Sequence, residues 1–466
     1  MQLRHPPIAA LALLLTAAPA AAAGELTYTC EDIAERARLT GFGTPVYQGD
    51  DGWFFRSNEI NHLYLLTDDS RTFLARLDAA LKLHDVRLVL MPLPSKAALA
   101  PEHAIAAAEA SNLLFDIDYS QSEFAKAIAT LKSFGVGVVD IAGYMHQQPP
   151  EKVEYYFAQD LHWRPDFAEV AAEATAATLA EMFPGEFPAD KSFVTKLRPD
   201  LAEIQKSNSR RYLNQLCSPV IPGETLDIYE TVEADQSLDA FLGDESSVPP
   251  VSIVGTSFTD ERNKFNYAGF LREDLGADVA SYAISGGDLD QSIYKWSHSG
   301  LARSGTRVLL WEIPYLDRFE SAVGIMERTI VPAIAGACQG TDAEVLAADY
   351  ELTDGSYTLE LPPDLAVTGN GYYLAAGLTD PSPRGFTLSF DYRDGQRDIL
   401  PVIRAPRVGA VGELYAELSS EVASDLSSIT IRAIEGGGNS GTMALCRYPD
   451  ALQPGAPSGG PGNARS

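Results

Sequence analysis

The sequence predicts an α/β domain followed by a smaller β-sandwich domain. From residue 53 to about residue 337, apolar runs alternate with helical patterns, which is typical of a mainly parallel sheet covered by helices. Beyond residue 349 the pattern changes to short alternating stretches separated by Gly, Pro and Asp, which indicates a β-sandwich of about 100 residues. With 466 residues, of which 45% are hydrophobic, the chain can bury a core in each domain.

The elements of the α/β domain follow from continuous apolar runs, which suit buried strands, and from apolar residues at helical spacing. Pro165 stands at a favourable first helical position, and an alanine-rich segment continues from it to about residue 182. In chain order the expected strands are 86–91, 136–141, 251–254, 278–282 and 307–313, and the expected helices are 123–134, 165–182, 265–275 and 289–301. Segments 386–390 and 429–431 are examples of strands expected in the β-sandwich.

Both ends of the chain lie outside the expected domains. Residues 1–23 combine one early arginine, an apolar stretch and a small-residue end, which indicates a cleavable secretory signal peptide. Residues 451–466 are rich in Gly, Pro and Ser and are expected to form a disordered tail. The α/β domain is therefore placed at 24–345 and the β-sandwich at 346–450. No later segment is long and apolar enough to span a bilayer, so we expect an exported protein without a membrane span.

Charge and cysteine usage exclude several classes of function. A formal net charge of −29 argues against nucleic acid as a partner. The four cysteines are widely spaced and form no Cys-x-x-Cys pair, which argues against a zinc or redox site, and no cofactor is expected. In an oxidising compartment two disulfides are expected. Three pairings are possible, and pairing within domains favours Cys30 with Cys217 and Cys338 with Cys446.

Two short motifs supply the residues of an acyl-transfer site: Asp-Leu-His-Trp at 160–163 and Gly-Thr-Ser-Phe at 255–258. Serine is a weak nucleophile, so it needs an imidazole to take its proton and a carboxylate to orient that imidazole. In an extended loop, the carboxylate of Asp160 can reach Nδ1 of His162 and leave Nε2 free for Ser257. Either motif alone is usually an ordinary loop or turn, so their context decides.

The context favours a site at the edge of the sheet. Segment 251–254 reads as a buried strand that ends at Gly255, which places Ser257 just past its carboxyl end, where open α/β sheets bind their ligands. Position 259 is threonine, so the second glycine of Gly-x-Ser-x-Gly is missing, which argues against an ordinary α/β-hydrolase elbow. His162 lies at the entrance of the helix expected from residue 165.

Four segments together resemble the SGNH-hydrolase-like alginate O-acetyltransferases of the two-domain AlgX type. They are Gly-Asp-Asp-Gly-Trp-Phe-Phe at 49–55, the two motifs above, and Trp-Glu-Ile-Pro at 311–314. In that family the Asp-x-His-Trp block precedes the serine block, as it does here. The resemblance covers nearly the whole mature chain, including the layout of the four cysteines. It implies an SGNH-hydrolase-like domain followed by a carbohydrate-binding module, with Ser257 as nucleophile, His162 as base and Asp160 as its orienting partner.

Segment 282–287 falls where the family carries a glycine block beside the nucleophile. The resemblance makes the N–H of Gly287 a candidate oxyanion donor beside the N–H of Ser257, and the alternative is an ordinary strand-to-helix turn. Oxyanion donors stabilise the charge that develops on the substrate carbonyl oxygen.

Residues 370–449 contain seven arginines, no lysine and nine acidic residues. Arginine forks suit bidentate recognition of carboxylates, so Arg393, Arg397 and Arg404, with Tyr392, are the expected polysaccharide-binding residues. The alternative is a set of core aromatics with solvated arginines.

These observations predict a periplasmic O-acetyltransferase that moves an acetyl group through Ser257 onto hydroxyls of an exopolysaccharide, with alginate expected. The resemblance further implies an acetyl donor supplied by other proteins and a periplasmic polymer modification and secretion complex as partner. Because the strong negative charge repels a polyuronate at long range, a different polysaccharide stays open. The alternatives are an acetyl esterase, with water as acceptor, and a non-catalytic polysaccharide-binding scaffold.

Overall fold

The computed structural model describes residues 28–60, 64–149, 154–187, 191–234, 248–299, 305–315, 319–434 and 439–453. The expected signal peptide, and all of the expected tail except 451–453, lie outside the described residues. None of the helices in these ranges combines the length and the apolar character that a membrane crossing requires.

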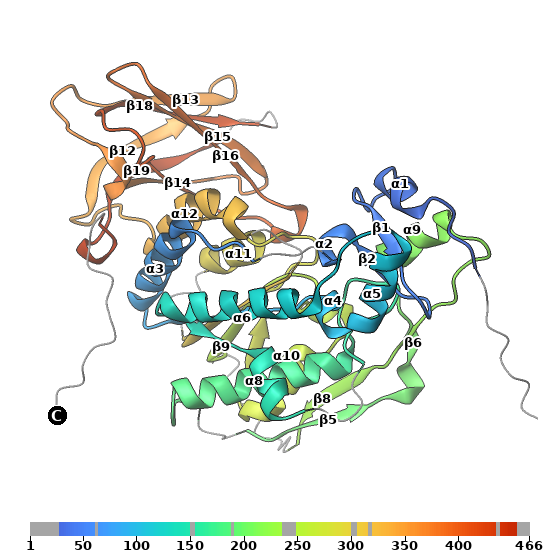
Figure 1. Cartoon of the computed structure of the whole chain (residues 1–466). Helices are drawn as coiled ribbons and strands as arrows, with labels where there is room; N and C mark the ends of the chain where they lie inside the picture. Colours follow the sequence, from blue (N-terminus) through green and yellow to red (C-terminus); the bar gives the residue numbers. More distant parts are fainter. Residues whose placement is uncertain are drawn as a thin grey trace, which may run out of the picture.

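A parallel sheet forms the centre of the larger part of the molecule (Figure 1). Its strands are β3 (Arg87–Pro92), β4 (Gly137–Val138), β9 (Val251–Val254), β10 (Val279–Ser281) and β11 (Val308–Ile313). Within the described residues these five strands lie in the order β10-β9-β11-β3-β4, and every neighbouring pair is parallel. The carboxyl ends of all strands therefore meet at one edge, where open sheets of this kind place their sites.

Helices cover both faces of this sheet. One face packs against α3 (Asp68–Lys82), α6 (Ile117–Ser133), α11 (Gln291–His298) and α12 (Phe319–Ala335), and the other against α7 (Ile141–Gln147), α8 (Pro165–Met182) and α10 (Tyr267–Leu275). Along β3, Leu88 and Leu90 join the first core, whereas Val89 and Met91 join the second. Strands buried on both faces are apolar at nearly every position, which is why their sequence reads as almost continuous hydrophobic runs.

The expected strands and helices of this region occur in the expected order, and two of them differ clearly in extent. The helix expected at 289–301 is α11, and residues 300–301 of that expectation lie outside the described residues. The strand expected at 136–141 is shortened to β4, because the Asp140 side chain accepts the N–H of Gly143 and begins α7. The helix expected at 123–134 begins earlier, because Asp116 caps α6 by accepting the N–H of Tyr119. Both differences come from aspartate caps that hydropathy alone does not reveal.

A smaller group of elements lies at the carboxyl-end side of the sheet, at the right in Figure 1. It contains α1 (Ile33–Arg38), β1 (Val46–Gln48), β2 (Phe54–Arg56), α2 (Ser57–Ile60), α4 (Lys96–Leu99), α5 (Pro101–Ala110) and α9 (Asn208–Leu216). Two antiparallel ribbons follow nearby, formed by β5 (Phe193–Leu197) with β8 (Tyr229–Glu233) and by β6 (Glu203–Ile204) with β7 (Thr225–Leu226). A disulfide between Cys30 and Cys217 closes this group, and it is the pairing that the sequence favoured.

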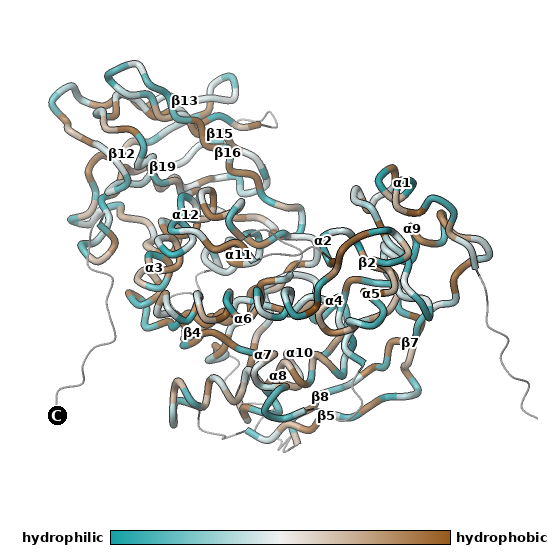
Figure 2. The backbone as a smooth tube through the Cα atoms, in the orientation of Figure 1, coloured by the Kyte–Doolittle hydropathy of each residue, from teal (hydrophilic) through white to brown (hydrophobic). Residues whose placement is uncertain are grey.

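The C-terminal part is built from two antiparallel sheets. The first has the order β12-β19-β14-β17, with bounds Glu344–Glu351, Ser440–Arg447, Tyr372–Gly377 and Glu413–Glu417. The second has the order β13-β18-β15-β16, with bounds Ser356–Glu360, Leu426–Ala433, Gly385–Tyr392 and Arg397–Ile403. Residues from both sheets, such as Leu374, Leu388 and Leu445, share one core. Figure 2 shows hydrophobic residues along β15 and along α12. We call this part the β-domain.

The first sheet of the β-domain also packs on α3 and α12, and a buried ion pair crosses this interface. Arg76 of α3 donates to both carboxylate oxygens of Glu417 at 2.8 Å and to Glu327 of α12 at 2.6 Å. Tyr448 donates a further hydrogen bond to Glu417, whose side chain is only 2% exposed. Burial raises the pKa of Glu417, whereas the charge and hydrogen bonds of Arg76 oppose that shift.

Two further links fix the β-domain to the helices. Arg328 of α12 donates to Asp398 and to the carbonyl of Glu417. Cys338, which follows α12, is bonded to Cys446 of β19. This is again the pairing that the sequence favoured, but the bridge crosses the boundary expected after residue 345. The expectation that both bridges lie within single domains is therefore wrong for this bridge.

His298, at the end of α11, has a largely buried imidazole beside the same interface. Its ring stacks on Tyr294 and contacts Tyr415 of β17, with centroid distances of 4.1 and 5.4 Å. Burial lowers the pKa of His298 to about 4, and the charge of Arg404 adds to the shift, whereas the hydrogen bond to the Tyr294 carbonyl opposes it.

Replacing His298 by glutamine is expected to make the protein less sensitive to acid. Between pH 6.5 and pH 4, the unfolded chain binds a proton at this imidazole that the folded chain does not bind. The wild type should therefore lose about 2 kcal/mol more of its free energy of unfolding than His298→Gln between pH 7 and pH 5. Urea denaturation of both proteins at the two pH values measures the difference, and equal losses would contradict the assignment.

Candidate active site

Ser257 lies just past β9, at the carboxyl edge of the parallel sheet, as the sequence predicted. Gly255 begins its loop, and a Cβ there would lie only 2.5 Å from Oε2 of Glu312, so this position needs glycine. Glu312, on neighbouring β11, accepts the N–H of Thr256 at 2.6 Å and the hydroxyls of Thr256 and Thr259 at 3.1 and 3.3 Å. These bonds hold the loop against the sheet and leave Ser257 partly exposed.

Glu312 had no individual role among the residues predicted from the sequence, although its motif at 311–314 contributed to the resemblance. Its side chain is fully buried at the end of β11. A carboxylate in an otherwise apolar buried strand needs hydrogen-bond donors, and here they come from the nucleophile loop. A lone charge inside a hydrophobic run was therefore the signal for this residue.

Asp160 and His162 lie on the turn of a short hairpin that an isolated bridge between Tyr156 and Trp163 closes. The indole N–H of the buried Trp163 donates to the carbonyl of Phe258 at 3.0 Å. The hairpin is thereby docked directly onto the nucleophile loop. This contact explains why the tryptophan stands immediately after the histidine in the motif.

The structure brings the three sequence-predicted residues into one hydrogen-bonded chain. Nδ1 of His162 lies 2.7 Å from Oδ2 of Asp160, and Nε2 lies 2.7 Å from Oγ of Ser257. Gln205 donates to the same Asp160 oxygen at 2.6 Å. Burial of Asp160 opposes its ionisation, but the charge of His162 and the hydrogen bonds from His162 and Gln205 outweigh it and hold the pKa below its ordinary value. Gln205 carries no signal in the sequence, because a single loop glutamine belongs to no motif.

The glycine segment after β10 is tied to the nucleophile loop. Asn263 donates to the carbonyl of Ser257 at 2.6 Å and to the hydroxyl of Ser285 at 2.9 Å. The N–H of Gly287 donates to the carbonyl of Ile284 at 3.0 Å. The expectation of Gly287 as an oxyanion donor is therefore wrong, because its N–H closes a turn. The N–H of Ser257, in contrast, has no hydrogen-bond partner among the described residues.

An open pocket of about 570 Å³ lies between this glycine segment and the β-domain. Gln291 bridges its two sides, because its Oε1 accepts the N–H of Ala405 at 2.6 Å. Arg407, beside the pocket, donates to the carbonyl of Ser285 at 3.0 Å. The lining residues from the β-domain include the exposed Arg384 and Ile403, and those from the α/β part include Asp288 and Asp290.

The structure corrects the expected polysaccharide-binding set. Arg404 is 5% exposed and donates to four backbone carbonyls of its own domain, and Tyr392 is 3% exposed in the β-domain core. Their assignment to a binding surface is wrong, because neither side chain is accessible. Arg393 donates to backbone carbonyls within 362–365, and Arg397 pairs with Asp391. Both lie at the hairpin end of β15 and β16, far along the strands from Arg404.

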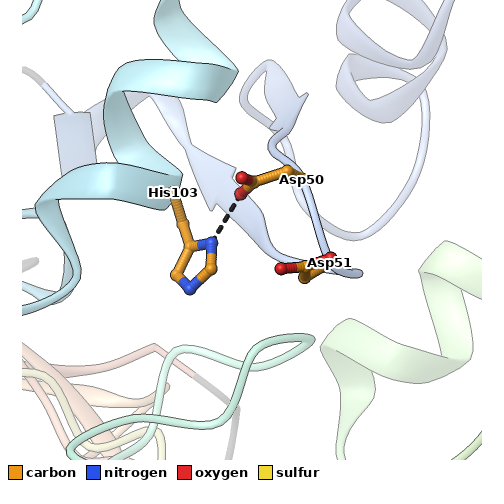
Figure 3. Close-up of side chains that lie close together, drawn as sticks. All are labelled: Asp50, Asp51 and His103. Carbon is orange, nitrogen blue, oxygen red and sulfur yellow. Dashed lines mark hydrogen bonds and ion pairs between the residues drawn. The ribbon is translucent and has the colours of Figure 1, made fainter.

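Asp50, Asp51 and His103 form a polar cluster at the loop between β1 and β2 and on α5. Figure 3 shows Nδ1 of His103 directed at Asp50, with Asp51 beside them, and the Asp50–His103 distance is 2.5 Å. Within the described ranges, this cluster has the spacing of possible cation ligands, with ligand atoms within 4.8 Å of one another. Both carboxylates are exposed and the hydrogen bond already uses Nδ1 of His103, so we assign the cluster no role in the chemistry.

The family described as an SGNH hydrolase-like domain, acetyltransferase AlgX, matches residues 46–315, which include the three residues of the hydrogen-bonded chain. The alginate biosynthesis protein AlgX of Pseudomonas aeruginosa is 27% identical over 395 residues, or 84% of this chain and 80% of that protein. The probable alginate O-acetylase AlgJ of Pseudomonas fluorescens is 30% identical over 290 residues, or 59% of this chain and 69% of that protein.

A solved structure of AlgX from Pseudomonas aeruginosa has the same fold. It superposes with a TM-score of 0.75 at 24% sequence identity, covering 89% of this chain and 98% of that chain. The superposed part of this chain is longer than the α/β part alone. The likeness therefore extends into the β-domain.

Proposed function

Because the chain belongs to the AlgX family of SGNH hydrolase-like acetyltransferase domains, as its motifs predicted, we propose that it is a polysaccharide O-acetyltransferase. The observation that carries the proposal is the hydrogen-bonded chain from Asp160 through His162 to Ser257. AlgX and AlgJ are named for alginate biosynthesis and alginate O-acetylation. We therefore infer alginate, or a similar acidic polysaccharide, as the acceptor.

In the first half-reaction, Nε2 of His162 takes the proton of Ser257 while Oγ attacks the carbonyl carbon of an acetyl donor. The carbonyl oxygen becomes an oxyanion, for which the free N–H of Ser257 is the proposed donor. When the tetrahedral intermediate collapses, the bond to the leaving group breaks and His162 returns the proton to that group. Asp160, held ionised, stabilises the imidazolium that exists between these two transfers.

In the second half-reaction, His162 takes the proton of a polysaccharide hydroxyl, whose oxygen attacks the acetyl ester on Ser257. The bond between Oγ and the acetyl carbon breaks, and His162 returns the proton to Ser257. The polymer leaves with a new acetyl ester, and the enzyme regains its starting state. Water in place of the hydroxyl would give acetate, and the partial exposure of Ser257 makes an acetyl esterase the second candidate function.

We further propose that the β-domain, which begins with β12 and was expected at residues 346–450, is a carbohydrate-binding module, and that the acceptor lies in the pocket beside segment 284–287. Arg384 lines this pocket and Arg407 flanks it, and guanidinium groups suit the carboxylates of a uronate polymer. The carboxylates of Asp288 and Asp290 oppose that attraction, and burial raises the pKa of Asp290.

The expected setting is the periplasm, in a polymer modification and secretion complex in which other proteins supply the acetyl donor. The two disulfides and the periplasm fit together, because disulfides persist in oxidising compartments. The relatives' role in alginate biosynthesis supports this setting.

Incubation of the full-length protein with an acetyl-ester donor and mannuronate oligosaccharides, followed by mass spectrometry, tests the proposed reaction. Acetylated oligosaccharide is the expected product. Free acetate without acetylated sugar would replace the transferase with an esterase. Binding of the oligosaccharide without turnover of the donor, unchanged in Ser257→Ala, would instead support a scaffold.

Replacing Arg384 and Arg407 together by alanine is expected to weaken binding of mannuronate oligosaccharides about twofold to thirtyfold. Exposed charge pairs contribute roughly 0.2 to 1 kcal/mol each, and the effect should shrink as salt is added. Calorimetry on the Ser257→Ala background measures this binding without turnover. Arg393→Ala is the matched control, because it lies at the opposite end of β15. Equal losses in both proteins, or none in the double variant, would move the acceptor away from this pocket.

A further inference from the structure

Lys96 is a buried cation directly behind the proposed triad, and none of the steps above uses it. It is the first residue of α4, immediately after the cap residue Ser95, and its side chain is 0% exposed. The element follows β3 of the central sheet, so the lysine reaches out from the rigid core of the domain.

The ammonium group of Lys96 gathers three backbone carbonyls. Its Nζ donates to the carbonyl of Phe54 at 2.7 Å and to those of Ala158 and Asp160 at 2.9 Å each. An ammonium has three N–H donors, so all of them are used. The rings of Trp53 and Phe55 flank the charge, with centroids 5.3 and 5.1 Å away.

The positive charge of Lys96 needs an explanation, because an uncharged side chain could fill the same space. Burial lowers the pKa of Lys96, and Glu59, Glu224 and Asp160 oppose the shift from a distance. Among the described residues, no carboxylate lies within ion-pair distance of Nζ. A buried ammonium without a bonded carboxylate is unfavourable, and an apolar side chain of similar length would avoid this cost. We therefore attribute the positive charge at this position to the binding of the three carbonyls.

Two of these carbonyls lie in the turn of the short hairpin, between Tyr156 and Trp163, that carries Asp160 and His162. Ala158 and Asp160 lie on either side of Gln159, and the Ala158 carbonyl also accepts the N–H of Phe54 on β2. Glu224 binds the other side of the turn by accepting the N–H groups of Ala158 and Gln159, both at 2.8 Å. The turn that leads into Asp160 is thus held by a cation on its carbonyl side and by an anion on its N–H side. Lys96 links this turn to the central sheet.

We propose that Lys96 is a positioning residue that holds the backbone of Asp160 so that its carboxylate meets Nδ1 of His162. This inference rests on the proposed triad, and it concerns how the triad is kept in place. Lys96 touches no reacting atom. It acts through the backbone carbonyl of Asp160, whose own side chain makes the 2.7 Å contact with the imidazole of His162.

Labelling of Ser257 by a fluorophosphonate tests this role, because the probe needs an activated serine but neither acetyl donor nor polysaccharide. Lys96→Met keeps the length of the side chain and removes the three donors. We expect its labelling rate to fall about tenfold to hundredfold while circular dichroism shows a folded protein, since displacements of about 1 Å in a catalytic site have effects of this size. Arg76→Met is the matched control, because it also removes a largely buried cation but lies at the domain interface. Under conditions in which circular dichroism shows this variant folded, it should label at the wild-type rate.

A double-mutant cycle with Asp160→Asn separates positioning from general destabilisation. If Lys96 acts through Asp160, adding Lys96→Met to Asp160→Asn should change labelling by less than about twofold. Lys96→Gln, which keeps an amide donor, enters the same cycle if the methionine variant does not fold. Full multiplication of the two losses, or wild-type labelling in a folded Lys96 variant, would overturn the role of Lys96. A wild-type protein that does not label at Ser257 would overturn the proposed triad itself.

Discussion

Replacing Ser257 by alanine is expected to abolish acetyl transfer while the protein stays folded. Its Oγ is the atom proposed to carry the acetyl group, so without it only binding and oxyanion stabilisation remain. The expected loss is at least about 10⁴-fold, and His162→Ala should lose as much, because members of such a triad act as a unit. Transfer to mannuronate oligosaccharides, followed by mass spectrometry, measures the loss.

Asp160→Ala should be severe but less complete, because His162 can still take a proton without its orienting partner. Ser133→Ala is the matched control, since Ser133 is an exposed serine at the end of α6 and should leave transfer unchanged. Intact-mass measurement should find an acetylated intermediate in the wild type and none in Ser257→Ala. Retention of more than about a tenth of the activity in Ser257→Ala, a loss of only about 1.4 kcal/mol in transition-state stabilisation, would rule out the covalent mechanism.

Replacing Arg76 by methionine is expected to lower the free energy of unfolding by about 3 to 5 kcal/mol. The variant leaves Glu417 buried without the two hydrogen bonds and the positive charge that now compensate it. The pKa of Glu417 should then rise further, because burial already raises it and Arg76 opposes that shift in the wild type. Thermal and urea denaturation measure the loss.

The double variant Arg76→Met with Glu417→Leu is the informative control. It replaces the ion pair by apolar side chains of similar size, and such replacements are often neutral because both charges are removed together. The double variant should therefore be more stable than Arg76→Met alone. A single variant that loses less than about 1 kcal/mol would show that water or Tyr448 compensates Glu417 without Arg76.

The central sheet of the α/β part could be predicted from the sequence because its strands are buried on both faces, whereas helices such as α3 and α12 were not predicted. Continuous apolar runs located β3, β9 and β11, and the motif residues at their carboxyl ends then had to meet at one edge. The contact between Asp160 and His162 was predictable for a different reason, because only Leu161 lies between them in one loop. Their meeting with Ser257 needed the fold, because 95 residues separate His162 from it.

The rest depended on contacts that leave no local pattern. Arg404 was expected on a surface because arginine is usually exposed, but the β-domain folds its guanidinium under four carbonyls. Gly287 was expected to offer its N–H, but the turn that closes on Ile284 occupies it. Lys96 could not be recognised at all, since its acceptors are carbonyls from segments more than forty residues away. Backbone acceptors carry no residue identity, so no motif records them.

The place of β19 in its sheet has a consequence for the order in which the parts of the chain can fold. Although β19 is the last strand of the described chain, it is an inner strand that pairs with β12 on one side and β14 on the other. It also carries Cys446, and Tyr448 follows it directly. A chain that is made from its N-terminus therefore has its α/β part complete before the sheet that covers α3 and α12 can form. A stop codon even a few residues before Ser440 would remove the centre of that sheet and both of these links, so it would cost the whole β-domain and leave an apolar helical face exposed.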